Sequence, residues 1–153
     1  MENKIEVKKK NPIHPELFTY FKDKAGWKAQ FLRPELLSKK WDMYVMEELP
    51  NIYTIPAFTE DFCDYIIDEA ESCNCWTVDR HEHYPTTDMV LQTLGFQDIY
   101  QDILEEYIWP MAKHVYMLEE DSWLKMRSEN FLARYHPYAQ YHLALHHDMS
   151  QIT

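Results

Sequence analysis

The chain has 153 residues, enough for one domain, and its 46% hydrophobic and 15% aromatic content excludes a disordered protein. Only two glycines are present, which argues against a P-loop or a dinucleotide-binding fingerprint, because both need clustered glycines. The sequence contains no run of about 18 apolar residues, so no membrane span is predicted. Segment 1–10 lacks the apolar core of a targeting signal.

Charge is distributed unevenly along the sequence. Residues 1–40 carry ten basic and five acidic side chains, a net charge of +5, whereas residues 41–153 carry five and twenty-one, a net charge of −16. The acidic part disfavours nucleic acid as a partner, because phosphates would be repelled. It suits a cationic substrate, which its field would attract. Solvated helix faces explain the same acidic residues equally well.

The first third of the chain is predicted to be mostly helical. Residues 1–15 are charged and contain two prolines, so we expect a linker or a loosely held arm there. Helices are expected over 16–24 and over 34–44, and the second begins at Pro34, a position where proline is tolerated. Residues 51–56 are rich in β-formers and predict a short strand.

The middle of the chain predicts two longer helices. Thr59 is expected to cap the first, because acidic residues follow it and an apolar stripe with helical spacing begins at Phe62. Residues 74–95 lack periodicity and are interpreted as a loop near a site entrance. Gly95 is expected to begin the longest helix, which Pro110 should kink or restart.

Three cysteines and a pair of histidines are candidate ligands. Cys73 and Cys75 are too close for an ordinary disulfide, and no second cysteine pair completes a zinc site. A bridge from Cys63 is possible but not implied, and burial of Cys63 on its helix is the favoured interpretation. His81 and His83 could bind a metal on a strand, but a loop is favoured because no third ligand is in view.

The C-terminal stretch predicts a metal pair. Strands are expected over 130–135 and over 142–148, with a turn at 137–140 between them. Residues two apart on a strand share a face, so His146 and Asp148 would project together. An imidazole and a carboxylate are two of the three ligands of a 2-His-1-carboxylate site for Fe(II). The alternative is a polar strand end where the histidine pairs with the carboxylate.

Neighbouring residues bear on this pair. His142 shares the face but lies roughly 13 Å from His146 along a strand, too far to bind the same ion unless the chain bends. Small Ala144 suits a strand that lines a cavity. The third ligand is normally a histidine further along, and the sequence stops at Thr153. Helices followed by strands suit a β-barrel or jelly roll with flanking helices, and we expect this chain to hold its first part.

The order of short motifs resembles a known family. They are Trp41-x-x-Tyr44, Pro56-Ala-Phe-Thr-Glu-x-Phe-Cys63-Asp, Cys75-Trp76, Pro85-Thr-Thr-Asp88-Met, Tyr107-Ile-x-Pro110, Asn130-Phe-Leu-Ala-Arg-Tyr135 and His146-His147-Asp148. No single motif is diagnostic, but the ordered set resembles the C-terminal catalytic domain of procollagen-lysine 2-oxoglutarate 5-dioxygenases, the collagen lysyl hydroxylases of animals and some large DNA viruses. Residues 1–37 would be an arm or the end of an accessory region, and 38–153 an incomplete dioxygenase domain.

The resemblance implies an α+β chain with a double-stranded β-helix that uses Fe(II), 2-oxoglutarate and ascorbate. It implies decarboxylation of 2-oxoglutarate to succinate, coupled to hydroxylation at C5 of lysine in X-Lys-Gly repeats. His146 and Asp148 would be iron ligands, and Tyr135 would reach 2-oxoglutarate. The family's distal iron-binding histidine and its arginine for 2-oxoglutarate have no match in this sequence.

The resemblance also suggests partners and a location. The partner would be a collagen-like polypeptide, the chain could form a homodimer, and glycosyltransferase domains could accompany it. The location would be the endoplasmic reticulum lumen, or the host cell for viral members. Two other hypotheses stay open: a truncated, non-catalytic interaction module that pairs through an exposed strand edge, and another 2-oxoglutarate oxygenase such as a prolyl hydroxylase.

Overall fold

The computed structural model describes residues 11–78, 80, 84–119 and 130–146, and within them helices combine with antiparallel strand pairs. This mixture confirms the predicted α+β class; the double-stranded β-helix stays a prediction. The elements, in chain order, are η1 (Pro15–Phe18), α1 (Lys24–Phe31), α2 (Pro34–Leu37), α3 (Trp41–Tyr44), β1 (Met46–Leu49), β2 (Ile52–Thr54), α4 (Glu60–Cys73), β3 (Thr87–Val90), α5 (Leu91–Leu94), α6 (Gln97–Ile103), the π-helical η2 (Leu104–Ile108), α7 (Trp109–Val115) and β4 (Phe131–Arg134).

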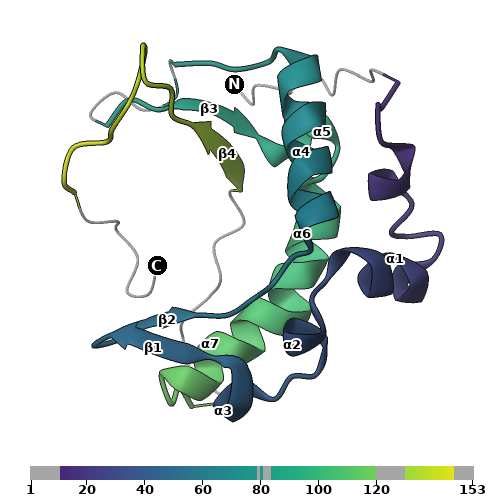
Figure 1. The fold of residues 1–153 in the computed structure, drawn as a ribbon, viewed down its shortest axis with the longest axis vertical. Helices are drawn as coiled ribbons and strands as arrows, with labels where there is room; N and C mark the ends of the chain where they lie inside the picture. The colour runs from purple at the N-terminus through teal and green to yellow at the C-terminus, as the bar shows by residue number, and fades with distance from the viewer. Residues whose placement is uncertain (1–10, 79, 81–83, 120–129, 147–153) are drawn as a thin grey trace.

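The two strand pairs lie at opposite ends of the molecule, with α6 and α7 running between them (Figure 1). The hairpin β1–β2 pairs Met46 with Thr54, and β3–β4 pairs Thr87 with Arg134. The strands predicted over 51–56 and 130–135 are therefore confirmed as β2 and β4. The interpretation of 74–95 as a loop is wrong in part, because β3 and α5 lie there. In the described part of the chain, no helix is long and apolar enough to cross a membrane.

The N-terminal helices differ from their predicted limits. The helix expected over 16–24 is wrong: the chain forms the 3-10 turn η1, and α1 begins only at Lys24. The side chain of Asp23 causes this late start, because it accepts a hydrogen bond of 2.9 Å from the backbone N–H of Gly26. An aspartate that caps a helix stands before its first turn, and it therefore sets where α1 begins.

The helix expected over 34–44 is divided into α2 and α3. Lys39 lies between them in the left-handed conformation, with φ of 54°. The Ser38 hydroxyl donates to the carbonyl of Glu35 at 2.9 Å and accepts from the N–H of Lys40 at 3.2 Å, which satisfies backbone groups at the break. Such local bonds compete with helix continuation. Trp41 begins the second piece and is buried.

Helix α4 follows the sequence rules closely. Thr59 caps it, as predicted, with its hydroxyl 3.4 Å from the N–H of Phe62. Its buried face contains Phe62, Ile66 and Ala70. The helix ends at Asn74, which has φ of 49° and donates its backbone N–H to the carbonyl of Glu71 at 3.2 Å. Asparagine tolerates this left-handed conformation better than most residues, so it serves as the C-terminal cap.

The second long helix passes through Pro110 without ending. Gly95, with φ of 76°, ends α5 rather than beginning the long helix, which starts at Gln97. Proline has no N–H, and its ring clashes with the carbonyl four residues earlier, here that of Glu106. The residues before it, Leu104–Ile108, form a π-helical segment, in which hydrogen bonds reach five residues instead of four. The wider turn accommodates the proline, and the chain continues as α7.

An aromatic cluster around Trp27 forms the centre of the core. The Trp27 ring centroid lies 5.0 to 6.4 Å from those of Tyr20, Phe31, Phe62 and Phe96. These residues come from α1, the turn before it, α4 and the start of α6. Ring pairs at such distances add stability beyond the area they bury. Residues before position 37 thus share one core with later helices; the predicted domain boundary after residue 37 stays a prediction.

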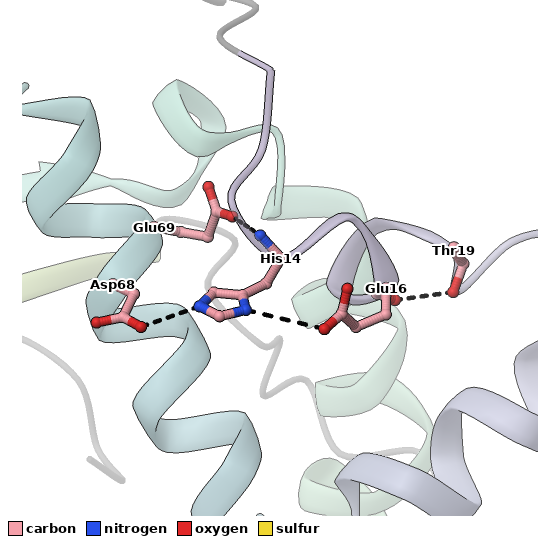
Figure 2. A network of polar contacts seen from close by, with 5 residues as sticks. All are labelled: His14, Glu16, Thr19, Asp68 and Glu69. Carbon is pink, nitrogen blue, oxygen red and sulfur yellow. Dashed lines mark hydrogen bonds and ion pairs between the residues drawn. The ribbon is translucent and has the colours of Figure 1, made fainter.

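The segment before η1 is fixed to the outer side of α4 by His14 (Figure 2). Its ring stacks on Tyr65, with centroids 4.0 Å apart and planes 3° apart. Nε2 of His14 lies 2.9 Å from Oδ2 of Asp68, and Nδ1 lies 3.8 Å from Glu16. The backbone N–H of His14 donates to Glu69 at 2.5 Å. Residues from His14 onward are therefore bound to the fold by stacking and polar contacts together.

Candidate functional site

The β3–β4 sheet carries one of the three predicted site residues. Tyr135 directly follows β4 and is 48% exposed. The chain then reverses in the turn predicted over 137–140: the N–H of His136 donates to the carbonyl of Gln140 at 2.7 Å. The segment that contains His146 therefore follows Tyr135 through a closed turn after β4.

The side chain of Gln140 joins this turn to β3. Its Oε1 accepts a hydrogen bond from the backbone N–H of Thr87, and its Nε2 donates to the carbonyl of Pro85 at 2.5 Å. One amide thus satisfies a donor and an acceptor of the same backbone stretch, as a neighbouring strand would. Gln140 thereby fixes where the segment 141–146 begins.

The strand expected over 142–148 does not form in its described part. Residues 141–146 have no regular structure, and the chain bends at Leu145, whose side chain is fully exposed. Nδ1 of His146 lies 2.9 Å from the carbonyl oxygen of Ala144, so that carbonyl bonds to a side chain instead of a strand neighbour. Without a strand, there is no alternation that would place His146 and Asp148 on the same face. Asp148 itself lies outside the described residues.

The geometry of His146 nevertheless suits a metal ligand. With Nδ1–H donating to Ala144, the imidazole has the tautomer whose Nε2 carries the lone pair that binds a metal. The ring also stacks on Tyr84, with centroids 4.8 Å apart. Imidazole and carboxylate donors suit Fe(II), and the role of His146 as an iron ligand stays a prediction. Among the described residues, no group of three or more His, Cys, Asp or Glu side chains could hold a metal ion.

The buried carboxylate of Asp88 is the feature that sequence reasoning missed. It lies in β3 with no exposed surface, accepts a hydrogen bond from the Thr86 hydroxyl, and pairs with Arg80 at 2.8 Å. Its backbone pairs with Thr77, with both hydrogen bonds at 2.9 Å. The Arg80 guanidinium also lies 5.2 Å from the Phe131 ring of β4. The sequence signal for this feature is an aspartate directly before an apolar run. The apolar run predicts burial, and a buried carboxylate requires polar partners.

Arg134, at the end of β4, connects this sheet to α4. Its guanidinium lies 2.9 and 3.2 Å from the two carboxylate oxygens of Glu71 and 4.7 Å from the Trp76 ring. A guanidinium that stacks on an aromatic ring and pairs with a carboxylate is held in one orientation. The residue before Tyr135 is therefore anchored to the last turn of α4.

The cysteines differ from expectation. Cys73 and Cys75 form a disulfide, so the interpretation that they are too close for a bridge is wrong. Their Cα atoms are 5.2 Å apart, within the ordinary range. The left-handed conformation of Asn74 between them turns the chain back and makes this possible. Cys63 is free and exposed rather than buried. His81 and His83 lie outside the described residues.

Comparison with known proteins confirms the resemblance. The chain is 31% identical over 153 residues to the multifunctional procollagen lysine hydroxylase and glycosyltransferase LH3 of Rattus norvegicus, and 28% over 152 residues to that of Homo sapiens. It is 27% identical over 151 residues to procollagen-lysine,2-oxoglutarate 5-dioxygenase 1 of Homo sapiens. Each match covers 92% of this chain and 20% of the relative, so the chain spans about a fifth of the length of these relatives.

One of these relatives is named a 2-oxoglutarate 5-dioxygenase. The model of the OGFOD2-like domain matches residues 7–120, more than half of the chain. The chain therefore belongs to the OGFOD2-like domain family. The match begins well before residue 38, in the part that shares the aromatic core.

Proposed function

We propose that the chain is part of an Fe(II)- and 2-oxoglutarate-dependent enzyme that hydroxylates lysine in X-Lys-Gly repeats of collagen-like polypeptides. The observation that carries this proposal is similarity over 92% of the chain to proteins named procollagen lysine hydroxylases. The α+β arrangement and the ordered motifs support it. The endoplasmic reticulum lumen as location and a homodimer as assembly belong to the same proposal, as does ascorbate as a further cofactor.

Three residues have roles in this proposal. Nε2 of His146 and the carboxylate of Asp148 would hold the iron, and the hydroxyl of Tyr135 would contact 2-oxoglutarate. When bound, Fe(II) would activate O2, one oxygen atom of which would oxidise 2-oxoglutarate to succinate and CO2 while the other would enter the C–H bond. The tautomer fixed by Ala144 supports His146. The exposed position of Tyr135, one residue after the anchored Arg134, leaves its ring accessible to a small molecule.

The charge of the chain supports a lysine-containing substrate. Residues 41–153 carry a net charge of −16, and such a field concentrates cationic peptides near the surface. Reversing surface acids away from the site should raise KM for cationic peptides, and the increase should shrink with added salt. An unchanged KM would count against this role of the charge.

The test is turnover of 2-oxoglutarate with Fe(II), ascorbate and an X-Lys-Gly peptide, with oxygen incorporation located by mass spectrometry. Succinate formation together with oxygen on lysine is the expected result for a protein that combines this chain with the distal histidine and the arginine of the family. A matched X-Pro-Gly peptide tests the alternative, another 2-oxoglutarate oxygenase such as a prolyl hydroxylase. Oxygen on proline instead of lysine would replace the first proposal by this alternative.

A further inference from the structure

The disulfide at the end of α4 is the feature that goes beyond the proposed function. We propose that Cys73 and Cys75 form a redox-active pair that exchanges electrons with low-molecular-weight thiols while the rest of the fold stays intact. The bridge encloses a single residue, Asn74, and ties two positions of the same helix end. It connects no separate elements of the fold.

This bridge contributes little to the stability of the fold. A disulfide stabilises a protein mainly by restricting the unfolded chain, and this effect grows with the number of residues in the closed loop. The loop here has the sequence separation 2, so the restriction is close to its minimum. A bridge that the fold does not need can open without unfolding the protein.

The end of α4 keeps its shape when the bridge opens. The N–H of Asn74 donates to the carbonyl of Glu71 at 3.2 Å, and this backbone bond closes the cap without either sulfur. Beyond the bridge, Trp76 lies against Arg134, and Thr77 pairs with Asp88. Both flanks of the Cys73–Cys75 pair are therefore held by contacts that reduction leaves in place.

A hydrogen-bond acceptor lies close to Cys75 for the thiol of the reduced state. Sγ of Cys75 lies 3.1 Å from the carbonyl oxygen of Cys73, within the distance at which a thiol donates to oxygen. The last carbonyls of a helix lack partners inside the helix, so a Cys75 thiol would satisfy one of them. Both cysteines are half-buried, and Asn74 between them is exposed, so a small thiol can approach the bridge.

The bridge exchanges with small thiols in two steps. A thiolate of the small thiol attacks one sulfur of the bridge, the S–S bond breaks, and the other protein sulfur leaves as a thiolate that takes up a proton. A second small thiolate then attacks the mixed disulfide and releases the remaining protein thiolate, which is also protonated. Two small thiols lose two electrons and become one disulfide, and the protein gains two thiols.

The free cysteine on the same helix is a separate thiol. Cys63 precedes Cys73 by ten positions, roughly 15 Å along a helix at about 1.5 Å per residue, too far to join the exchange in the folded chain. Cys63 is exposed and free. The variant Cys63→Ser therefore removes background alkylation without touching the pair, and it is the parent for the test.

The experiment incubates the Cys63→Ser chain in glutathione buffers of increasing reduced fraction, traps thiols by alkylation and counts them by mass spectrometry. We expect a reversible change from zero to two alkylated thiols without denaturant, and a melting temperature lowered by less than about 6 °C in the reduced chain. The proposal is overturned if the bridge stays closed in reduced glutathione until denaturant is added, or if reduction unfolds the chain.

A second variant keeps the test decisive if the double thiol state is hard to trap. Cys63→Ser with Cys75→Ser leaves Cys73 without its resolving partner, so oxidised glutathione should leave a stable adduct of one glutathione on Cys73. Absence of that adduct in the folded variant would also overturn the proposal. Neither readout needs Fe(II) or 2-oxoglutarate. A negative result for the redox pair therefore leaves the proposed hydroxylase activity unaffected, and a negative hydroxylase assay leaves the redox pair unaffected.

Discussion

Arg80 donates a hydrogen bond of 2.8 Å to Asp88, a carboxylate with no exposed surface. Asp88→Ala removes the anion that the half-buried Arg80 side chain faces, and removal of one partner of a buried ion pair is strongly destabilising. We expect the free energy of unfolding to fall by about 3 kcal/mol, measured by urea denaturation followed by tryptophan fluorescence.

The matched control for Asp88 is another ion-paired aspartate, Asp42. Its carboxylate lies 2.7 Å from Nε2 of His114, but its side chain is 92% exposed. Exposed pairs contribute at most about 1 kcal/mol, so Asp42→Ala should change stability little. An equal loss in the two variants would contradict the importance of burial at Asp88.

The free energy of unfolding should depend on pH through the carboxylates of Asp102 and Glu106, which pair with lysines of α1. Burial opposes ionisation of Asp102 and Glu106, but hydrogen bonds from Tyr20 and Lys24 lower the pKa of Asp102, and a hydrogen bond from Lys28 lowers that of Glu106. A carboxylate with a lowered pKa stabilises the fold above its unfolded pKa of about 4, and this stabilisation is lost as pH falls through the folded pKa. We therefore expect the free energy of unfolding to decrease from pH 5 downward.

The phenol of Tyr20 provides a specific check of this pH dependence. Tyr20→Phe removes the hydrogen bond that its hydroxyl donates to Asp102. The pKa of Asp102 should then move back toward its ordinary value, and the slope of unfolding free energy against pH should flatten. Urea titrations of both chains between pH 3 and pH 7 make the comparison; parallel slopes would exclude Tyr20 as a cause.

Two phenylalanines test whether the first residues belong to the core. Phe31 is completely buried beside Trp27, whereas Phe21 is 59% exposed. Phe31→Ala should cost about 3–5 kcal/mol, and Phe21→Ala much less, by the same denaturation assay. Small and similar costs would favour residues 1–37 as a loosely attached arm.

The amide of Gln140 should matter for the candidate site. Gln140→Leu keeps the size of the side chain but leaves the N–H of Thr87 without this acceptor, so a cost of about 1–3 kcal/mol is expected. Gln92→Leu, at an exposed position, is the control and should stay within about 0.5 kcal/mol. If Gln140 positions the following segment, 2-oxoglutarate turnover should fall only in the first variant.

Iron binding should depend on His146. His146→Ala should weaken Fe(II) binding by at least about 10-fold, measured anaerobically by equilibrium dialysis. His114→Ala removes an imidazole on α7 that pairs with Asp42 of α3, and it should leave iron binding unchanged. Equal binding by the two variants would remove His146 from the proposed ligand set.

Local rules predicted the parts of the structure that local contacts determine. The Thr59 cap, the strand before Tyr135 and the turn at 137–140 depend on residues within a few positions, and all three form. By contrast, β3 escaped prediction because its partner β4 lies more than forty residues later. The register of such a pair depends on contacts that no short window of sequence contains.

The candidate site was predicted less completely for related reasons. Residue types alone indicated His146, and its tautomer depends on the Ala144 carbonyl, which only the structure reveals. The strand expected over 142–148 does not form in its described part, because alternating polarity alone does not supply a neighbouring strand for its backbone hydrogen bonds. The bridge between Cys73 and Cys75 required the backbone angle of Asn74, which the sequence allows but does not dictate.

The π-helical segment Leu104–Ile108 gives one long helix a place where its length can change. A residue added inside an ordinary helix rotates everything after it by about 100°, and the buried face then points to solvent. A π turn absorbs one extra residue, so both sides of it keep their faces. Related chains could therefore differ by one residue between Ile103 and Trp109 and still align α6 and α7 against the same neighbours.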